Sequence, residues 1–159
     1  MAKLPRQALA IVVEVHMSVP PMNKTTNCIL VIHDDPLTAN QLRRAFRDAL
    51  PSAQVIVASC GADAAHLMDR GSFDLIVLDL VLRKETGYDL MPELIARAPR
   101  TPIVMLSTHD NEVTRHLCRE RGACAFEGTP TTAEGFAELA LRLREYIAHG
   151  PISLWRAVN

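Results

Sequence analysis

Short apolar runs alternate along this chain with longer stretches in which apolar residues recur every three or four positions. The apolar runs predict strands at residues 28–33, 54–58, 73–79, 103–107 and 123–126. The periodic stretches predict helices over residues 36–50, 62–69, 89–98, 110–121 and 132–148. Strands that alternate with helices in this way are typical of βα units on a parallel sheet. We therefore predict an α/β domain, doubly wound, with helices on both faces of a five-stranded sheet.

Start and stop signals support several of these boundaries. Asp35 is a good N-cap, and Pro36 suits the first helical position, so the first helix is expected to begin there. Pro51 ends that helix, and Gly71 is expected to end the second one. The buried stripe of the first helix is predicted from its spacing of three and four: Leu42, Ala45, Phe46 and Ala49.

The alternation divides the chain into three parts: an N-terminal extension at 1–26, a domain at 27–148 and a tail at 149–159. Residues 10–15 are rich in β-branched side chains, which is compatible with an additional strand or with partial disorder of the extension. Pro20 and Pro21 would separate any such element from the first strand of the domain. No second, effector-type domain is expected in 159 residues.

Composition narrows the function classes. A formal charge of −1 gives no global attraction to nucleic acid or to an anionic membrane. The apolar stretch near the N-terminus is too short to span a bilayer. The four cysteines lack C-x-x-C spacing, so we expect free thiols and a cytoplasmic location rather than a disulfide framework or a zinc site.

Acidic residues end two of the predicted strands. Asp34 and Asp35 follow the first strand, and Asp79 ends the third. The carboxyl ends of parallel strands meet at one edge of an open sheet, which is where such sheets bind ligands. Three carboxylates placed together are electrostatically costly unless a cation offsets their charge, and Mg²⁺ prefers oxygen ligands of this kind. The pattern predicts metal-assisted phosphoryl chemistry on a carboxylate.

Taken in order, these residues resemble the receiver domain of bacterial two-component response regulators. The resemblance covers residues 27–148. It rests on the acidic pair, on Asp79, on Gly87 eight residues later, on Ser107 at the end of the fourth strand, and on Gly122 and Pro130 on either side of the fifth. It implies a flavodoxin-like sheet with strand order 2-1-3-4-5.

The resemblance also assigns roles to individual residues. Asp34, Asp35, Asp79 and the backbone carbonyl of Val81 are expected to hold Mg²⁺, and Asp79 to accept a phosphoryl group from a histidine kinase or phosphotransfer protein. Ser107 matches the hydroxyl residue that bonds the phosphoryl oxygen. Phe126 matches the switch residue, the aromatic that rotates when that hydroxyl is drawn inward. The output is expected to pass to a separate downstream effector protein, with the chain a monomer or weak dimer that contacts neither nucleic acid nor membrane.

The sequence departs from the family pattern at Thr129, where receivers usually carry a lysine. A threonine hydroxyl offers a weaker hydrogen bond than a lysine ammonium, by about 1–2 kcal/mol. Arg83 and Lys84 are nearby candidates for a replacement cation. We expect His33 and His109 to be solvated, although both lie near the predicted site and would attract a softer metal.

Two alternatives compete with a phosphorylated receiver. A degenerate receiver would act as a phosphorylation-independent binding module, and Thr129 supports that reading. An aspartate-nucleophile phosphatase is disfavoured because Val81 stands where that chemistry needs a second acid, and no G-x-G-x-x-G motif supports a dinucleotide enzyme. Enzymatic activity is expected to be at most self-phosphorylation and slow autodephosphorylation at Asp79.

Overall fold

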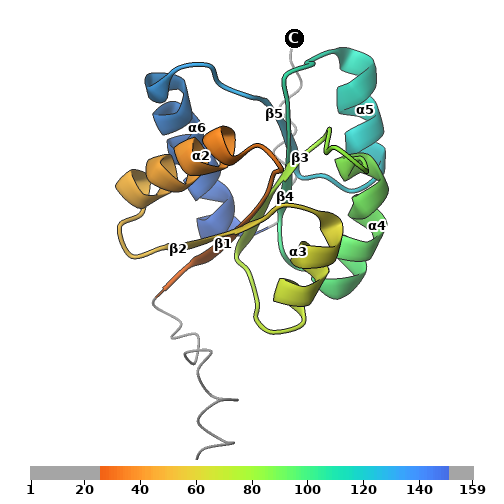
Figure 1. The fold of residues 1–159 in the computed structure, drawn as a ribbon, viewed down its shortest axis with the longest axis horizontal. Helices are drawn as coiled ribbons and strands as arrows, with labels where there is room; N and C mark the ends of the chain where they lie inside the picture. Colours follow the sequence, from red (N-terminus) through yellow and green to blue (C-terminus); the bar gives the residue numbers. More distant parts are fainter. Residues whose placement is uncertain (1–25, 151–159) are drawn as a thin grey trace, which may run out of the picture.

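Five parallel strands pair in the order β2-β1-β3-β4-β5 in a computed structural model that describes residues 26–150 (Figure 1). The strands are β1 (Cys28–Ile32), β2 (Gln54–Ala58), β3 (Leu75–Asp79), β4 (Ile103–Ser107) and β5 (Ala125–Gly128). The helices between them are α2 (Pro36–Ala49), α3 (Gly61–Met68), α4 (Gly87–Arg97), α5 (Glu112–Glu120) and α6 (Ala133–His149). The predicted α/β class and strand order are confirmed.

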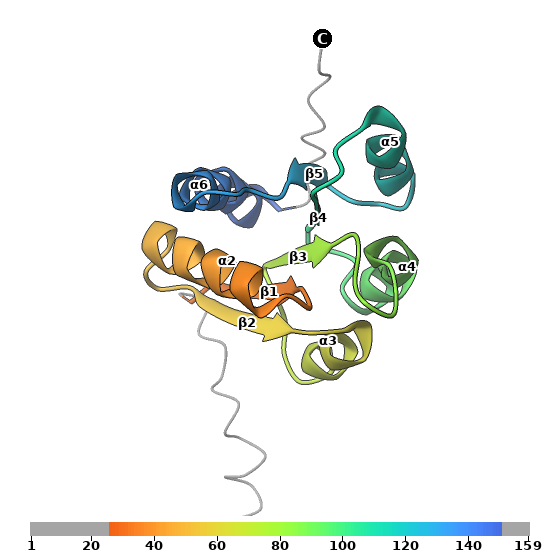
Figure 2. The same ribbon diagram turned by 45° about the horizontal axis from the view of Figure 1, so that its top comes forward.

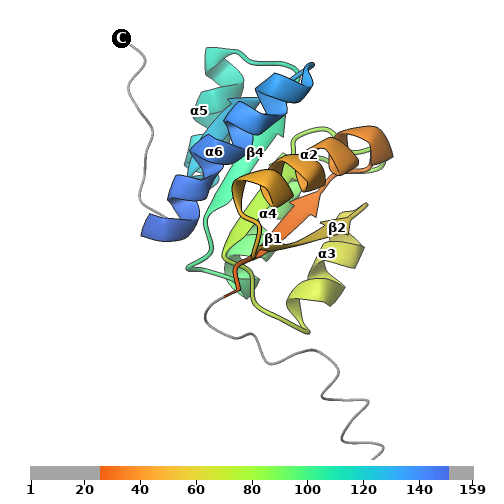
Figure 3. The same cartoon turned by 90° about the vertical axis from the view of Figure 1, so that its left-hand side faces the viewer.

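Two apolar cores lie on opposite faces of the sheet because side chains alternate along each strand. Leu30 and Ile32 of β1 face the core under α3, α4 and α5, whereas Ile29 and Val31 face the core under α2 and α6. Figure 2 shows the helices divided in this way, and Figure 3 shows α2 and α6 side by side on one face. Strands buried on both faces read as continuous apolar runs, which explains the hydrophobic pattern.

The start of α2 follows from its sequence. Asp35 is the N-cap, and its carboxylate accepts hydrogen bonds from the backbone N–H groups of Leu37 and Thr38. Pro36 occupies the first helical position, where the missing N–H costs nothing. The predicted stripe is buried at Leu42, Ala45 and Phe46 and half-buried at Ala49. The predicted start and stripe of this helix are confirmed.

Some predicted boundaries were wrong. The fifth strand was expected at 123–126 but pairs over Ala125–Gly128, because its register with β4 joins Val104 to Ala125 and Ser107 to Gly128. The α3 helix spans Gly61–Met68, within one residue of the predicted 62–69, but Asp69 is its C-cap and Gly71, which has no positive φ, is not the residue that ends it. Apolar pattern alone did not locate these ends, since they depend on pairing and capping.

The expected strand at residues 10–15 lies outside the described residues. Among residues 26–150, no helix has the length and apolar character needed to cross a membrane.

Gly87 begins α4 in close contact with the end of β3. A Cβ built at Gly87 would lie 2.3 Å from the backbone oxygen of Asp79 and 3.0 Å from Leu78 Cγ. The Gly87 N–H also donates to the backbone oxygen of Leu80 at 2.8 Å. Only glycine allows the helix to approach the backbone this closely, so Gly87 helps to fix the position of Asp79.

We expect Gly87→Ala to destabilise the fold by about 1–3 kcal/mol, because the backbone of β3 must shift to admit a methyl group. Chemical denaturation measures this loss. Gly128→Ala is the matched control, since a Cβ there meets nothing within 4 Å. Equal stability of the two variants would contradict the close approach.

Candidate functional site

The carboxyl ends of β1 and β3 bring the central side chains together. Ile32 pairs with Leu78 in the parallel register, so the residues that follow, His33 and Asp79, are neighbours at the same edge. Oxygen or nitrogen atoms of His33, Asp34 and Asp79 lie within 4.8 Å of one another. The sequence predicted that Asp34, Asp35 and Asp79 converge, and the structure brings Asp34 and Asp79 together with His33 in place of Asp35.

Asp79 is the most enclosed of these carboxylates, with 9% of its surface exposed. Burial raises its pKa above the usual value, and the negative charge of Asp34 adds to that effect. The neighbouring His33 and the backbone N–H of Val81, which lies 3.4 Å from Oδ1, act in the opposite direction. The ionised form of Asp79 is therefore costly in the folded protein, and a cation beside it would offset part of that cost.

Asp34 is held by the loop that follows β3. Its Oδ2 accepts a hydrogen bond of 2.6 Å from the backbone N–H of Arg83, and the Arg83 guanidinium Nε lies 3.8 Å away. The Arg83 side chain is 81% exposed, so this charge pair is screened by solvent and contributes little to stability. The expectation that Arg83 supplies a cation near the site agrees with this contact.

Asp35 has a different role from Asp34. Besides the two backbone N–H groups that it caps, its carboxylate accepts a hydrogen bond of 2.5 Å from Thr38 Oγ1. These bonds lower the pKa of Asp35, with the Thr38 hydroxyl as the largest cause. The carboxylate is thus engaged at the N-terminus of α2, outside the close group of His33, Asp34 and Asp79.

His33 is buried, with 8% of its surface exposed, so the expectation of a solvated histidine was wrong. Its Nδ1 accepts a hydrogen bond of 3.1 Å from the backbone N–H of Asp35. The other ring nitrogen, Nε2, lies 3.5 Å from Oδ2 of Asp79. His109, in contrast, is exposed on the loop after β4, as expected.

Ser107 and Thr129 meet at the ends of β4 and β5. Ser107 is 1% exposed, and its Oγ accepts a hydrogen bond of 3.0 Å from the backbone N–H of His109. The Thr129 N–H donates to the backbone oxygen of Ser107 at 2.8 Å. Thr129 is half-buried and directly follows β5, so a lysine at this position would extend from the same edge of the sheet as Ser107.

Phe126 on β5 is buried at 4% exposure and lies beneath Arg115 of α5. The guanidinium carbon of Arg115 is 5.2 Å from the ring centroid. The same guanidinium makes two hydrogen bonds to the carboxylate of Asp110, in the loop between β4 and α5. Arg115 therefore links this loop to the aromatic ring.

Val81 lies on the loop after Asp79, and its side chain is 59% exposed. The loop is closed by a bridge between Val81 and Thr86 and is tied to α3 by Glu85, whose Oε1 accepts a hydrogen bond of 2.5 Å from the Gly61 N–H. This anchoring fixes the backbone near Asp79.

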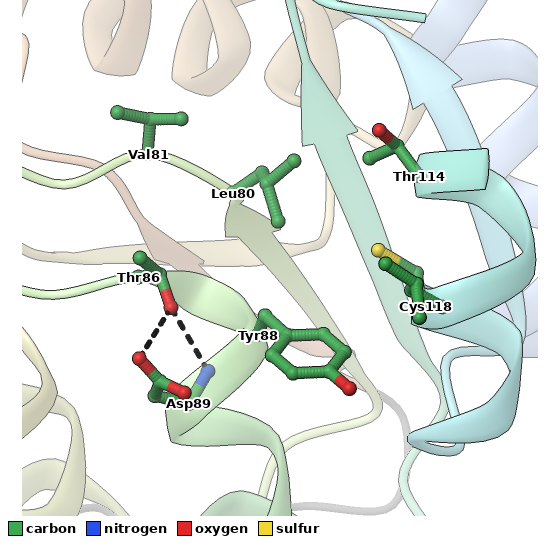
Figure 4. Close-up of a pocket in the computed structure, with 8 residues that line it drawn as sticks. Leu80, Val81, Thr86, Tyr88, Asp89, Thr114 and Cys118 are labelled. Carbon is green, nitrogen blue, oxygen red and sulfur yellow. Dashed lines mark hydrogen bonds between the residues drawn. The ribbon is translucent and has the colours of Figure 1, made fainter. Parts of the chain in front are cut away.

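Beside the loop, a pocket of about 480 Å³ opens between α4 and α5 (Figure 4). Leu80 and Val81 border it from the loop, Tyr88 from α4, and Thr114 and Cys118 from α5. Thr86 Oγ1 accepts a hydrogen bond from the Asp89 N–H at 3.1 Å and so caps α4 at the rim. The pocket is separate from the carboxylate group, although Val81 borders it two residues after Asp79.

The donor set at the edge of the sheet fits a divalent cation. Asp34 and Asp79 supply carboxylate oxygens, and burial of Asp79 raises the benefit of a positive charge there. The family model of the response regulator receiver domain matches residues 29–126 of this chain. The chain belongs to this receiver family.

Curated relatives agree with that membership. The transcriptional regulatory protein CpxR of Escherichia coli is 32% identical over 118 residues, which are 74% of this chain and 48% of CpxR. The transcriptional activator protein IrlR of Burkholderia pseudomallei is 30% identical over 122 residues, 77% of this chain and 51% of IrlR. The chain spans about half the length of these relatives.

Solved structures share the fold of this receiver. The phosphorylated cyanobacterial phytochrome response regulator RcpA is 19% identical, with a TM-score of 0.70 over 77% of this chain and 94% of that one. The Mn(2+)-bound form of response regulator Rcp1 is 18% identical, with a TM-score of 0.64 over 76% of this chain and 93% of that one. At these identities the likeness concerns the fold alone.

The raised pKa of Asp79 predicts a stability effect that depends on pH. Ionisation of Asp79 destabilises the folded protein. This destabilisation is absent below a pH of about 3.8, the ordinary pKa of the aspartate in the unfolded chain, and is complete above the pKa of the folded protein. In the presence of a chelator, we expect Asp79→Asn to raise the melting temperature by a few degrees at pH 7, and by less as the pH falls toward 3.8. Thermal unfolding monitored by circular dichroism measures it.

Asp48→Asn on the exposed face of α2 is the control for this experiment, because Asp48 lies away from the site. A gain at Asp79 that is constant with pH would show that packing, rather than charge, is responsible.

Proposed function

We propose that this receiver takes a phosphoryl group onto Asp79 from a phosphohistidine and passes the signal to a separate protein. The observation that carries the proposal is the position of Asp79: it ends β3 at the carboxyl edge, buried, with Asp34 beside it. Membership of the receiver family and its relatedness to regulatory proteins of two-component systems support the same reading.

In the proposed step, a carboxylate oxygen of Asp79 attacks phosphorus, the phosphorus–nitrogen bond breaks, and the imidazole of the donor leaves. The product is an acyl phosphate on Asp79. Little covalent chemistry falls to the protein, so positioning and charge stabilisation carry the rate. Gly87 and the tied loop position Asp79, and the buried hydroxyl of Ser107 is the proposed partner of a phosphoryl oxygen.

A divalent cation, Mg²⁺ in the usual receiver chemistry, would offset negative charge on the phosphoryl oxygens. Asp34, Asp79 and the carbonyl of Val81 are the proposed ligands. Asp35 stays in the proposed set as a neighbour of the ion and not as a direct ligand, because its carboxylate already caps α2.

The proposed partners are a histidine kinase or phosphotransfer protein upstream and an effector protein downstream. We propose a cytoplasmic monomer or weak dimer that contacts neither nucleic acid nor membrane directly. Its catalytic activity would be confined to self-phosphorylation and slow autodephosphorylation at Asp79. The net charge of −1 favours protein partners over polyanions.

Incubation with acetyl phosphate and a divalent cation should add one phosphoryl group per chain, as measured by intact mass. Labelling should require the cation, because Asp79 lies beside the like charge of Asp34. Asp79→Asn should abolish labelling, and Asp48→Asn on the far part of α2 should leave it unchanged. An unlabelled wild type, or an Asp79→Asn variant labelled equally, would sink the proposal.

A second candidate is a degenerate receiver that binds its partner without phosphorylation. Thr129 favours it, because the ammonium that would hold a phosphoryl oxygen is missing from that position. The two candidates share the same fold and differ in whether phosphate at Asp79 changes the surface around α5 and β5.

Thr129→Lys separates these candidates. The added ammonium should strengthen the response to phosphorylation by about 1–2 kcal/mol, a factor of about 5–30 in the switching equilibrium. Hydrogen–deuterium exchange measures it as a larger phosphorylation-induced change around Ser107 and Phe126. Thr131→Lys, two residues further on and exposed, adds the same charge as a control. Identical responses in the two variants would argue against the role given to position 129.

A further inference from the structure

His33 brings a nitrogen ligand into a site that the family pattern would fill with oxygen. Its ring is buried, Nε2 lies 3.5 Å from Asp79 Oδ2, and Nδ1 lies 4.0 Å from Asp34 Oδ1. We infer that His33, Asp34 and Asp79 form a site that prefers borderline transition-metal dications, such as Co²⁺, over Mg²⁺. The inference rests on the cation site of the proposed function and concerns which ion occupies it.

Ligand chemistry sets the direction of this preference. Mg²⁺ is a hard ion that prefers oxygen ligands, whereas imidazole suits the later transition metals. Asp35 does not restore a third carboxylate to the group, because three hydrogen bonds hold it at the N-cap of α2. One nitrogen and two carboxylates are therefore the side-chain donors that the described residues bring together here.

The charge of the site acts in the same direction. With a histidine in the group, two carboxylates, Asp34 and Asp79, supply the negative charge where three would otherwise do so. An ion held mainly by carboxylate charge loses the most affinity when one carboxylate is missing. An ion that also gains a bond to nitrogen recovers part of that affinity.

The test compares Mg²⁺, Mn²⁺ and Co²⁺ binding to the full chain by isothermal titration calorimetry. We expect affinity to rise from Mg²⁺ to Mn²⁺ to Co²⁺. His33→Asp should lower the ratio of Co²⁺ to Mg²⁺ affinity by at least ~10-fold, since loss of even an outer-shell partner of a metal ligand costs about 10–100-fold. The visible absorption of bound Co²⁺ should also change when its nitrogen ligand is replaced by oxygen.

Three further variants complete the design. His33→Asn keeps a similar size without the imidazole and should also lose the Co²⁺ preference, which guards against a folding defect in His33→Asp. Asp79→Asn should weaken all three ions. His109→Asn, an exposed histidine on the neighbouring loop, should leave the ratio unchanged. Thermal unfolding without metal checks that each variant is folded.

An unchanged ratio in both His33 variants, loss of the preference in His109→Asn, or no ion binding would overturn the inference. Labelling of Asp79 by acetyl phosphate, measured separately with each ion, distinguishes this failure from failure of the proposed function. If Asp79 is labelled but the ratio of Co²⁺ to Mg²⁺ affinity is unchanged in the His33 variants, the proposed receiver function holds and the ion preference is wrong. A changed ratio without labelling supports the ion preference and removes the phosphoryl transfer.

Discussion

Parallel pairing between β1 and β3 is the constraint on which the site depends. The pairing of Ile32 with Leu78 forces His33 and Asp79 to leave the sheet side by side. Both strands are buried along their whole length, so a slip in register would expose apolar side chains on two faces at once. Burial of the two strands therefore holds His33 and Asp79 next to each other.

The polar groups at this edge are balanced by neighbours within the protein. Asp35 is satisfied by the start of α2, Asp34 by the backbone of the loop after β3, and Asp79 is approached by His33 and the N–H of Val81. The pKa of Asp79 is raised, because its hydrogen bonds and charge contacts do not outweigh its burial. The site is thus prepared for a positive charge at one position in particular.

Much of the fold could be predicted from sequence because the relevant signals are local. Strands such as Gln54–Ala58 and Ile103–Ser107 were located to the residue by their apolar runs, and α2 by its cap and proline. The end of β5 was missed, since partner register decides it. At the site, Asp34 and Asp79 were found from the strand ends, but His33 was assigned to solvent. Whether a residue after a strand caps the next helix or faces the neighbouring strand depends on one backbone turn, which composition does not reveal.

The contact of Arg115 with Phe126 has a consequence for the dynamics of this receiver. Any rotation of the ring out from under Arg115 gives up a cation–π contact of about 0.5–1 kcal/mol. If the guanidinium instead follows the ring, the contact is kept but the pair of hydrogen bonds to Asp110 is lost. Arg115 therefore couples the loop after β4 to the aromatic of β5, because movement of either one breaks a contact that this arginine makes.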